Sequence, residues 1–183
     1  ILTLVFAQLI RPGKGLAARL GWSGWDWAAV NSAVKIFLLC LPVIWILMLL
    51  AKMVFEYFHW KISTPVLQDM LQHGSWSLVI FIALLAVCVA PVVEEIIFRR
   101  LLFCFIGGYC GCWPALLITS LLFAIIHDCQ VQFPALFVFG AALQMLYLER
   151  RSLAAPIIAH ACNNLLTIGF LIVGRICGWE WVW

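Results

Sequence analysis

Apolar runs separated by short polar segments recur along the whole chain. We predict that five of them are membrane helices, because about 20 mainly apolar residues in a helix cross a bilayer. Their apolar centres span residues 36–51, 78–93, 114–127, 133–148 and 153–173. A sixth run, Ile1–Ile10, is too short to span and lacks the basic leader of a signal peptide. We interpret it as a truncated first membrane helix.

The segments between these runs carry the signals of loops and interfaces. Residues 11–27 combine glycine, proline and basic residues with tryptophans, as an interfacial loop does. Residues 56–75 are polar and are expected to connect two membrane helices through one short amphipathic helix. The glycines of residues 106–113, IGGYCGCW, predict a turn. No linker or repeat divides the sequence, so we expect a single membrane-embedded domain over residues 1–183.

The composition identifies lipid as the solvent of this chain. Hydrophobic residues make up 66% of it and charged residues 10%, whereas a soluble domain has about 45–50% and about 25%. The prediction is therefore an all-α, polytopic membrane helix bundle of about six transmembrane helices, the first one truncated. Such a chain is multi-pass in a cell membrane, and its first partner is membrane lipid. The net charge of +3 is too small and scattered for a nucleic-acid surface.

One stretch places charges inside an apolar run, APVVEEIIFRRLLF. Glu95 and Arg99 are spaced i, i+4, which favours an ion pair on one helix face. Glu94 points about 100° away and is left without a partner on its own helix. Pro91 breaks the helical hydrogen bonding and frees a carbonyl, which is tolerated only near a cavity or another helix. The alternative is a helix end at the water interface, where charges are merely solvated.

Two later runs carry further polar groups at membrane depth. His127 closes SLLFAIIH, and His160 and Asn164 are spaced i, i+4 on one helix face. Taken singly, such residues are often hydrogen-bonding contacts between helices. Inward-facing side chains from different helices of a bundle nevertheless converge on one site. Because ionisable residues inside a membrane usually serve function, we predict an active site within the bundle.

Three motifs resemble those of the type II CAAX prenyl endopeptidases and their bacterial relatives, the CPBP or Abi family. EEIIFR (Glu94–Arg99) fits the family motif EExxxR, and FAIIH (Phe123–His127) is similar to its FxxxH motif. HACNN (His160–Asn164) matches its HxxxN motif. The three occur in the order of the family, each on its own predicted helix. The resemblance covers a motif-bearing protease core over residues 78–173.

The resemblance implies an intramembrane endopeptidase that hydrolyses peptide bonds. Glu94 and His127 would then activate the attacking water, and His160 and Asn164 would stabilise the oxyanion of the tetrahedral intermediate. Supporting roles would fall to Glu95, Arg99 and Phe123.

The resemblance leaves the cofactor and the exact substrate open. A carboxylate with two imidazoles, from Glu94, His127 and His160, could hold one zinc ion or could activate water directly. The substrate would be a membrane-associated or lipid-attached peptide. Relatives suggest peptide maturation, bacteriocin self-immunity or regulated proteolysis, and the compact chain suggests a bacterial inner membrane.

A second hypothesis comes from another functional class. A non-catalytic membrane module or a proton-coupled transporter would also bury Glu and His residues, as a proton relay. The predicted spans also place His127 and His160 at different depths in the membrane. His127 lies late in its run and His160 early in its own, so their depths match only if the helices tilt or are staggered.

Overall fold

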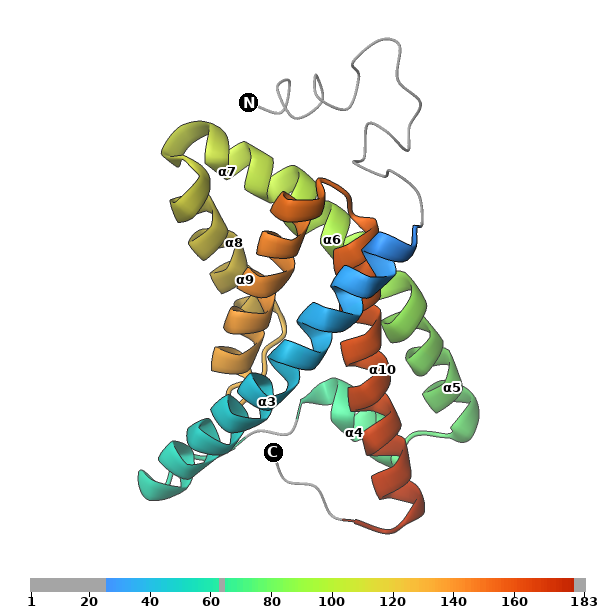
Figure 1. Ribbon diagram of the computed structural model, residues 1–183. Coiled ribbons are helices and arrows are strands. Elements are labelled where there is room, and N and C mark those ends of the chain that lie inside the picture. The colour runs from blue at the N-terminus through green and yellow to red at the C-terminus, as the bar shows by residue number, and fades with distance from the viewer. Residues whose placement is uncertain (1–25, 63–64, 180–183) are drawn as a thin grey trace.

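The structure is a computed structural model that describes residues 26–62 and 65–179. The truncated first helix and most of the loop expected over residues 11–27 lie outside the described residues. The described part is all-α, without a strand, which confirms the predicted fold class (Figure 1). Three of its helices are long and apolar enough to cross a membrane, namely Trp27–Tyr57, Trp76–Cys110 and Ala154–Ile176.

The element boundaries extend most of the predicted spans. The α-helices are α3 (Trp27–Tyr57), α4 (Val66–His73), α5 (Trp76–Leu84), α6 (Ala90–Glu95), α7 (Phe103–Cys110), α8 (Cys112–Ile126), α9 (Phe133–Arg150) and α10 (Ala154–Ile176). Two π-helical segments, η1 (Leu85–Val89) and η2 (Ile96–Leu102), join α5 to α6 and α6 to α7. The short helix expected within residues 56–75 is α4, whose N-terminal residue Val66 is exposed while Leu71 is buried.

The charged stretch lies in the middle of a helix. The segment from α5 to α7 is one continuous helix of 35 residues, Trp76–Cys110, so the interpretation of residues 94–100 as a helix end is wrong. The turn predicted over residues 106–113 is in the right place but shorter than predicted, since only Gly111 separates α7 from α8. The helix continues to Cys110, because its last turns pack against α8 through Phe103 and Leu116. The chain reverses only at Gly111, whose φ of 85° suits glycine.

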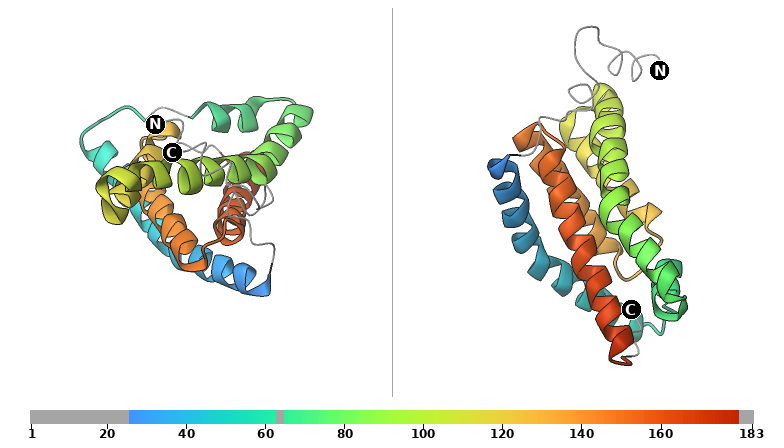
Figure 2. Two further views of the ribbon diagram at one scale, coloured as in Figure 1. Left: turned by 90° about the horizontal axis from the view of Figure 1, so that it is seen from above. Right: turned by 90° about the vertical axis from the view of Figure 1, so that its right-hand side faces the viewer.

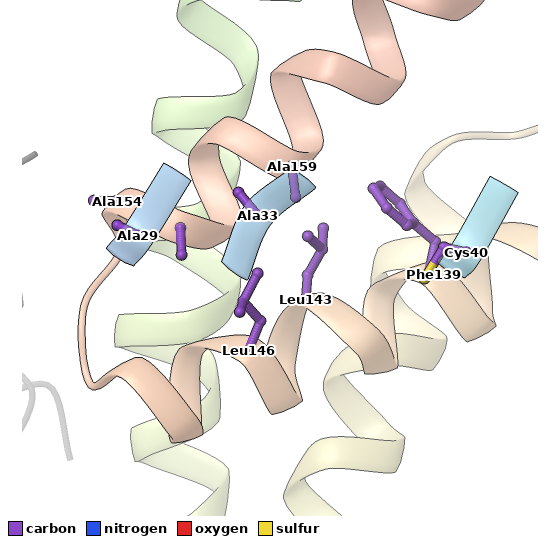
Figure 3. Packing of buried hydrophobic residues seen from close by; sticks show 9 residues of the cluster. Ala29, Ala33, Cys40, Phe139, Leu143, Leu146, Ala154 and Ala159 are labelled. Carbon is purple, nitrogen blue, oxygen red and sulfur yellow. The ribbon is translucent and has the colours of Figure 1, made fainter. Parts of the chain in front are cut away.

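Small residues bring three helices together at the centre of the bundle. In Figure 3, Ala29 and Ala33 of α3 face Leu143 and Leu146 of α9 and Ala159 of α10. Small side chains allow helix backbones to approach closely, which is the usual source of packing energy between helices in lipid. The cluster therefore fixes how α3, α9 and α10 cross.

The outer faces of these helices are apolar and exposed. Leu49 of α3, Phe81 of α5 and Leu165 of α10 each keep more than half of their surface accessible. Apolar side chains on the outside suit a surface in contact with acyl chains, where backbone polar groups are satisfied within the helix. The protein is therefore a membrane protein, as its composition predicted.

The 76–110 helix and α10 lie side by side and position the polar residues (Figure 2). Val92 and Ile96 pack against a buried cluster that includes Tyr147 of α9 and Ile157 of α10. This packing turns the face of α6 that carries the glutamates toward α8 and α10.

Candidate active site

Glu95 forms the predicted ion pair with Arg99 inside the bundle. Arg99 Nε donates a hydrogen bond of 2.8 Å to Glu95 Oε2, and both side chains are fully buried. The guanidinium carbon of Arg99 lies 5.1 Å from the ring centre of Phe123. Its two terminal nitrogens have no hydrogen-bond partner among the described residues. The aromatic face therefore contributes to holding this buried cation.

The other oxygen of Glu95 binds a residue from a distant helix. His160 Nδ1 lies 2.9 Å from Glu95 Oε1, and the side chain of His160 is 2% exposed. An ionised carboxylate only accepts hydrogen bonds, so the hydrogen of the neutral imidazole lies on Nδ1. The contact fixes the orientation of the ring and leaves Nε2 as the nitrogen that faces Glu94.

His127 also turns its Nε2 toward Glu94, but a backbone carbonyl rather than a carboxylate orients its ring. It is the residue after the last turn of α8, and its Nδ1 lies 2.7 Å from the carbonyl oxygen of Phe123. A carbonyl also only accepts, so the hydrogen again lies on Nδ1 and Nε2 keeps its lone pair.

Glu94 is the point at which the two imidazoles meet. Glu94 Oε2 lies 3.7 Å from His127 Nε2 and 3.9 Å from His160 Nε2. This oxygen is buried and has no hydrogen-bond partner among the described residues, although the Glu94 side chain as a whole is 23% exposed. Both imidazole Nε2 atoms thus lie within 4 Å of an acceptor oxygen that no described residue binds. Such a site accepts a hydrogen-bond donor or a cation: a water molecule, a proton or a metal ion.

The structure therefore brings together residues from three motifs. The two histidines lie near one carboxylate oxygen, so the expected mismatch in depth is absent. The two histidines reach the same level because α8 and α10 are staggered, so that the end of α8 lies beside the second turn of α10. Asn164 is the exception, since its Nδ2 donates a hydrogen bond of 2.8 Å to the backbone oxygen of Ala86 rather than to a group of the carboxylate site.

Phe123 is the aromatic centre of the site. Its fully buried ring lies 4.6 Å from the ring of His127, 5.6 Å from that of His160 and 5.4 Å from that of Phe98. Sequence reasoning missed Phe98 and Phe139, whose rings pack on Phe123 and His160 respectively. Aromatic residues are common in apolar helices, so the sequence carried no signal that singled these two out.

Gly140 is a second residue that sequence reasoning missed. A Cβ atom at this position would lie 3.2 Å from Phe123 Cδ1 and 3.4 Å from Ser120 Cα. Glycine therefore allows α9 to approach α8 directly behind Phe123. An isolated glycine inside an apolar helix is a signal of such close approach, and it was available in the sequence.

An open hollow lies at the end of α8 and is not lined by His127 or Glu94. It has a volume of about 620 Å³ and lies between α3, the end of α8 and the start of α9. Its lining is mainly apolar and includes Val54, Phe55, Ile125 and Phe133, with Asp128 among the few polar groups. Ligand sites commonly combine an apolar lining with a few polar groups in this way.

The three donors fit a metal ion in chemical type, since zinc prefers imidazole nitrogen and carboxylate oxygen. In a tetrahedral site with bonds of about 2.0–2.1 Å, neighbouring ligand atoms lie about 3.4 Å apart. The distances of 3.7 and 3.9 Å exceed this by a few tenths of an ångström. Accordingly, no group of three or more His, Cys, Asp or Glu residues in the described ranges already has the arrangement of a metal site.

A comparison with known proteins identifies the family of the chain. Residues 75–166, half of the chain, match the family described as type II CAAX prenyl endopeptidase Rce1-like. The matched range contains both glutamates, both histidines and Asn164. No curated protein and no solved structure matches the chain.

Proposed function

Since this chain belongs to the type II CAAX prenyl endopeptidase Rce1-like family, we propose that it hydrolyses peptide bonds of membrane-held peptides with water activated by Glu94 and His127. The family implies a protease, and the apolar helices imply that it acts in a membrane. The observation that supports the site best is the convergence of His127 Nε2 and His160 Nε2 on Glu94 Oε2.

The first step is the activation of water. A water molecule between Glu94 Oε2 and His127 Nε2 meets two hydrogen-bond acceptors, so its hydrogens point at the protein and its lone pairs point away. Glu94 removes one proton as the water oxygen bonds to the carbonyl carbon of the peptide. The π electrons of that carbonyl move onto its oxygen, which becomes an oxyanion.

The second step needs a hydrogen-bond donor for the oxyanion. His160 provides it when protonated, because its Nε2 then carries a hydrogen directed into the site. Glu95 stabilises the resulting imidazolium through the 2.9 Å contact with Nδ1, in the way that a buried carboxylate supports a catalytic histidine. The oxyanion then collapses, the C–N bond breaks, and Glu94 returns its proton to the leaving amine.

We propose a lipid-attached or otherwise membrane-associated peptide as the substrate. The open hollow between α3, α8 and α9 supports this choice, because its mainly apolar lining suits lipid or large apolar side chains. Within that class, prenylated proteins, bacteriocin precursors and regulated membrane proteins are the candidates. We propose a multi-pass location in the cell membrane, in a bacterium the inner membrane.

A zinc ion, if bound, would be held by Glu94, His127 and His160. It would polarise the peptide carbonyl and lower the pKa of a bound water. Glu95 and the Phe123 carbonyl would then serve to orient the two imidazoles through their Nδ1 hydrogens.

The direct test compares Glu94→Gln with Glu56→Gln in purified protein reconstituted into vesicles. Glu56 is an exposed glutamate on α3 that pairs with Lys52, so it is a control of the same residue type outside the carboxylate site. The probe is a fluorogenic peptide that ends in a farnesylated CAAX sequence, assayed beside the same peptide without lipid. We expect Glu94→Gln to lower kcat about 10²–10⁴-fold and Glu56→Gln to leave it unchanged.

The same assay distinguishes the protease from the alternative function. A non-catalytic module or proton-coupled transporter would not cleave either peptide, and unchanged cleavage by Glu94→Gln would exclude Glu94 as the base. Cleavage of only the lipidated probe would support a lipid-attached substrate.

A further inference from the structure

Two buried side chains beside the site carry polar atoms that no described residue binds. Arg99 of η2 and Gln144 of α9 are both fully buried. Neither terminal nitrogen of Arg99 and neither polar atom of the Gln144 amide has a hydrogen-bond partner among the described residues. Polar groups buried within a membrane protein are costly unless they are hydrogen-bonded. These four atoms therefore indicate a ligand that forms hydrogen bonds with them.

The ring of Phe123 relates the two side chains to each other. The guanidinium carbon of Arg99 lies 5.1 Å from the centre of this ring. Gly140 of α9 lies against the same ring, because a Cβ atom there would be 3.2 Å from Phe123 Cδ1. Gln144 follows Gly140 by four residues, so it lies one turn further along the same face of α9. Arg99 and Gln144 are thus both close neighbours of the ring.

A second contact gives the same placement from the side of η2. Ile96 of η2 packs against the buried cluster that contains Tyr147 of α9. Ile96 precedes Arg99 by three residues, and Tyr147 follows Gln144 by three residues. The part of η2 that carries Arg99 therefore faces the part of α9 that carries Gln144, and both side chains lie between the Phe123 ring and the contact of Ile96 with this cluster.

Water is the ligand that these atoms fit. The terminal nitrogens of a guanidinium only donate hydrogen bonds, whereas an amide side chain both donates and accepts. Glu95 already balances the positive charge of Arg99, so a neutral ligand suits the site better than an anion. Buried water molecules in proteins typically form about three hydrogen bonds with polar groups that would otherwise be unsatisfied.

We propose that Arg99 and Gln144 hold an internal water molecule beside Phe123, distinct from the water that Glu94 activates. The water accepts a hydrogen bond from a terminal nitrogen of Arg99 and donates one to Gln144 Oε1. It links α9 to the guanidinium that binds Glu95. The proposal goes beyond the proposed function, because this water is a structural ligand whose binding requires no cleavage of a peptide.

Solid-state NMR of the native chain in lipid vesicles, with ¹⁵N-labelled arginine, detects this water directly. The signals of Arg99 are identified by their loss in Arg99→Lys. We expect transfer of magnetisation from water protons to the terminal nitrogens of Arg99, and loss of this transfer in Gln144→Leu. Gln130→Leu is the control, since Gln130 is an exposed glutamine between α8 and α9, and it should keep the transfer. A native chain without the transfer, or a Gln144→Leu variant that keeps it, would overturn the proposal.

Thermal unfolding of the same protein in detergent gives an independent readout. Gln144→Leu should lower the melting temperature of the native chain, because an apolar side chain leaves the N–H groups of Arg99 without their ligand. It should not lower the melting temperature of the double variant Glu95→Gln with Arg99→Met, which has no guanidinium to satisfy. An equal fall in both backgrounds would contradict a link between Gln144 and Arg99.

Gln144→Glu tests whether Gln144 is within reach of Arg99. A carboxylate at this position should be tolerated in the native chain, where it lies near the guanidinium, and should strongly lower the melting temperature of the double variant, where it is a buried charge without a partner. A large fall in the native chain as well would place Gln144 away from Arg99. A native chain that cleaves no peptide would contradict the proposed function alone, since none of these measurements depends on activity.

Discussion

His160 and Glu95 lie 65 positions apart in the chain and form a hydrogen bond of 2.9 Å in the interior of the bundle. Arg99 binds the second oxygen of the same carboxylate at 2.8 Å. Glu95 therefore joins an ion pair within its own helix to the imidazole of another helix. Its neighbour Glu94 has an Oε2 atom without a hydrogen-bond partner among the described residues. We therefore expect Glu95 to stabilise the fold and Glu94 to take part in the reaction.

Replacement of Glu95 should destabilise the fold, whereas replacement of Glu94 should not. Glu95→Gln leaves the Arg99 guanidinium buried without a carboxylate, which costs about 3–5 kcal/mol. We expect a clear fall in the melting temperature of Glu95→Gln in detergent, and a native melting temperature for Glu94→Gln. Thermal unfolding followed by tryptophan fluorescence measures both.

A double variant is the control for this pair. Glu95→Gln with Arg99→Met removes both charges, and it should recover most of the lost stability. A single Glu95→Gln variant that melts like the native protein would show that the ion pair does not stabilise the bundle.

Any zinc ion that the purified protein binds at this site should depend on Glu94, His127 and His160. Both imidazole Nε2 atoms lie within 4 Å of one carboxylate oxygen, and imidazole nitrogen and carboxylate oxygen are donor types that zinc accepts. Mass spectrometry of the metal content, after dialysis against zinc, measures the stoichiometry. His127→Asn should lower it, and His73→Asn, on the exposed face of α4, should not. Zinc binding that survives Glu94→Gln and His127→Asn would place the ion elsewhere.

Substitution of Gly140 should disturb the aromatic centre of the site. The added methyl of Gly140→Ala would press on Phe123, which is enclosed by Arg99 and two histidines and cannot yield. Overpacking of this kind costs about 1–3 kcal/mol, more than the gain of about 0.5–1 kcal/mol from alanine in a helix. We expect a lower melting temperature and a lower kcat.

Gly169→Ala is the matched control for that substitution. Gly169 lies in α10, and a Cβ there would meet nothing within 4 Å. Gly169→Ala should therefore leave the protein as stable as the native chain or slightly more stable. Equal melting temperatures for the two alanine variants would contradict close packing at Gly140.

Cys129, in the connection between α8 and α9, should react slowly with alkylating agents at neutral pH. Burial raises the pKa of its thiol to about 11, and the negative charge of Asp128 adds to the effect. Because the pKa is raised, the reactive thiolate is scarce below that value, and its share rises about tenfold per pH unit up to it. Alkylation of the Cys129 peptide by iodoacetamide, followed by mass spectrometry from pH 7 to 10, measures this rise.

Asp128→Asn tests the cause of the raised pKa. Removal of the neighbouring charge should increase the alkylation rate of Cys129 at every pH in this range. A rate that levels off below pH 9 in the native chain would contradict the raised pKa.

Local patterns in the sequence were sufficient for the helices and for one contact of the site. Apolar runs predicted five of the helices, because length and apolarity decide whether a segment can cross a bilayer. The Glu95–Arg99 pair was predicted because helical geometry alone places residues i and i+4 together. The turn within residues 106–113 was predicted in the right place but too long, since packing of α7 on α8 keeps Gly107 and Gly108 helical.

By itself, then, the sequence determined an all-α membrane chain, the order of three polar motifs and the separation of Glu94 from Glu95. Only the tertiary structure decided that His160 binds Glu95, that Asn164 binds Ala86 and that Glu94 Oε2 faces both imidazoles. These contacts join different helices, so they depend on the stagger, rotation and crossing of those helices. Packing at small residues such as Ala33, Gly140 and Ala159 sets the stagger, rotation and crossing of the helices. The spacing of residues along a single helix does not determine how that helix packs on another.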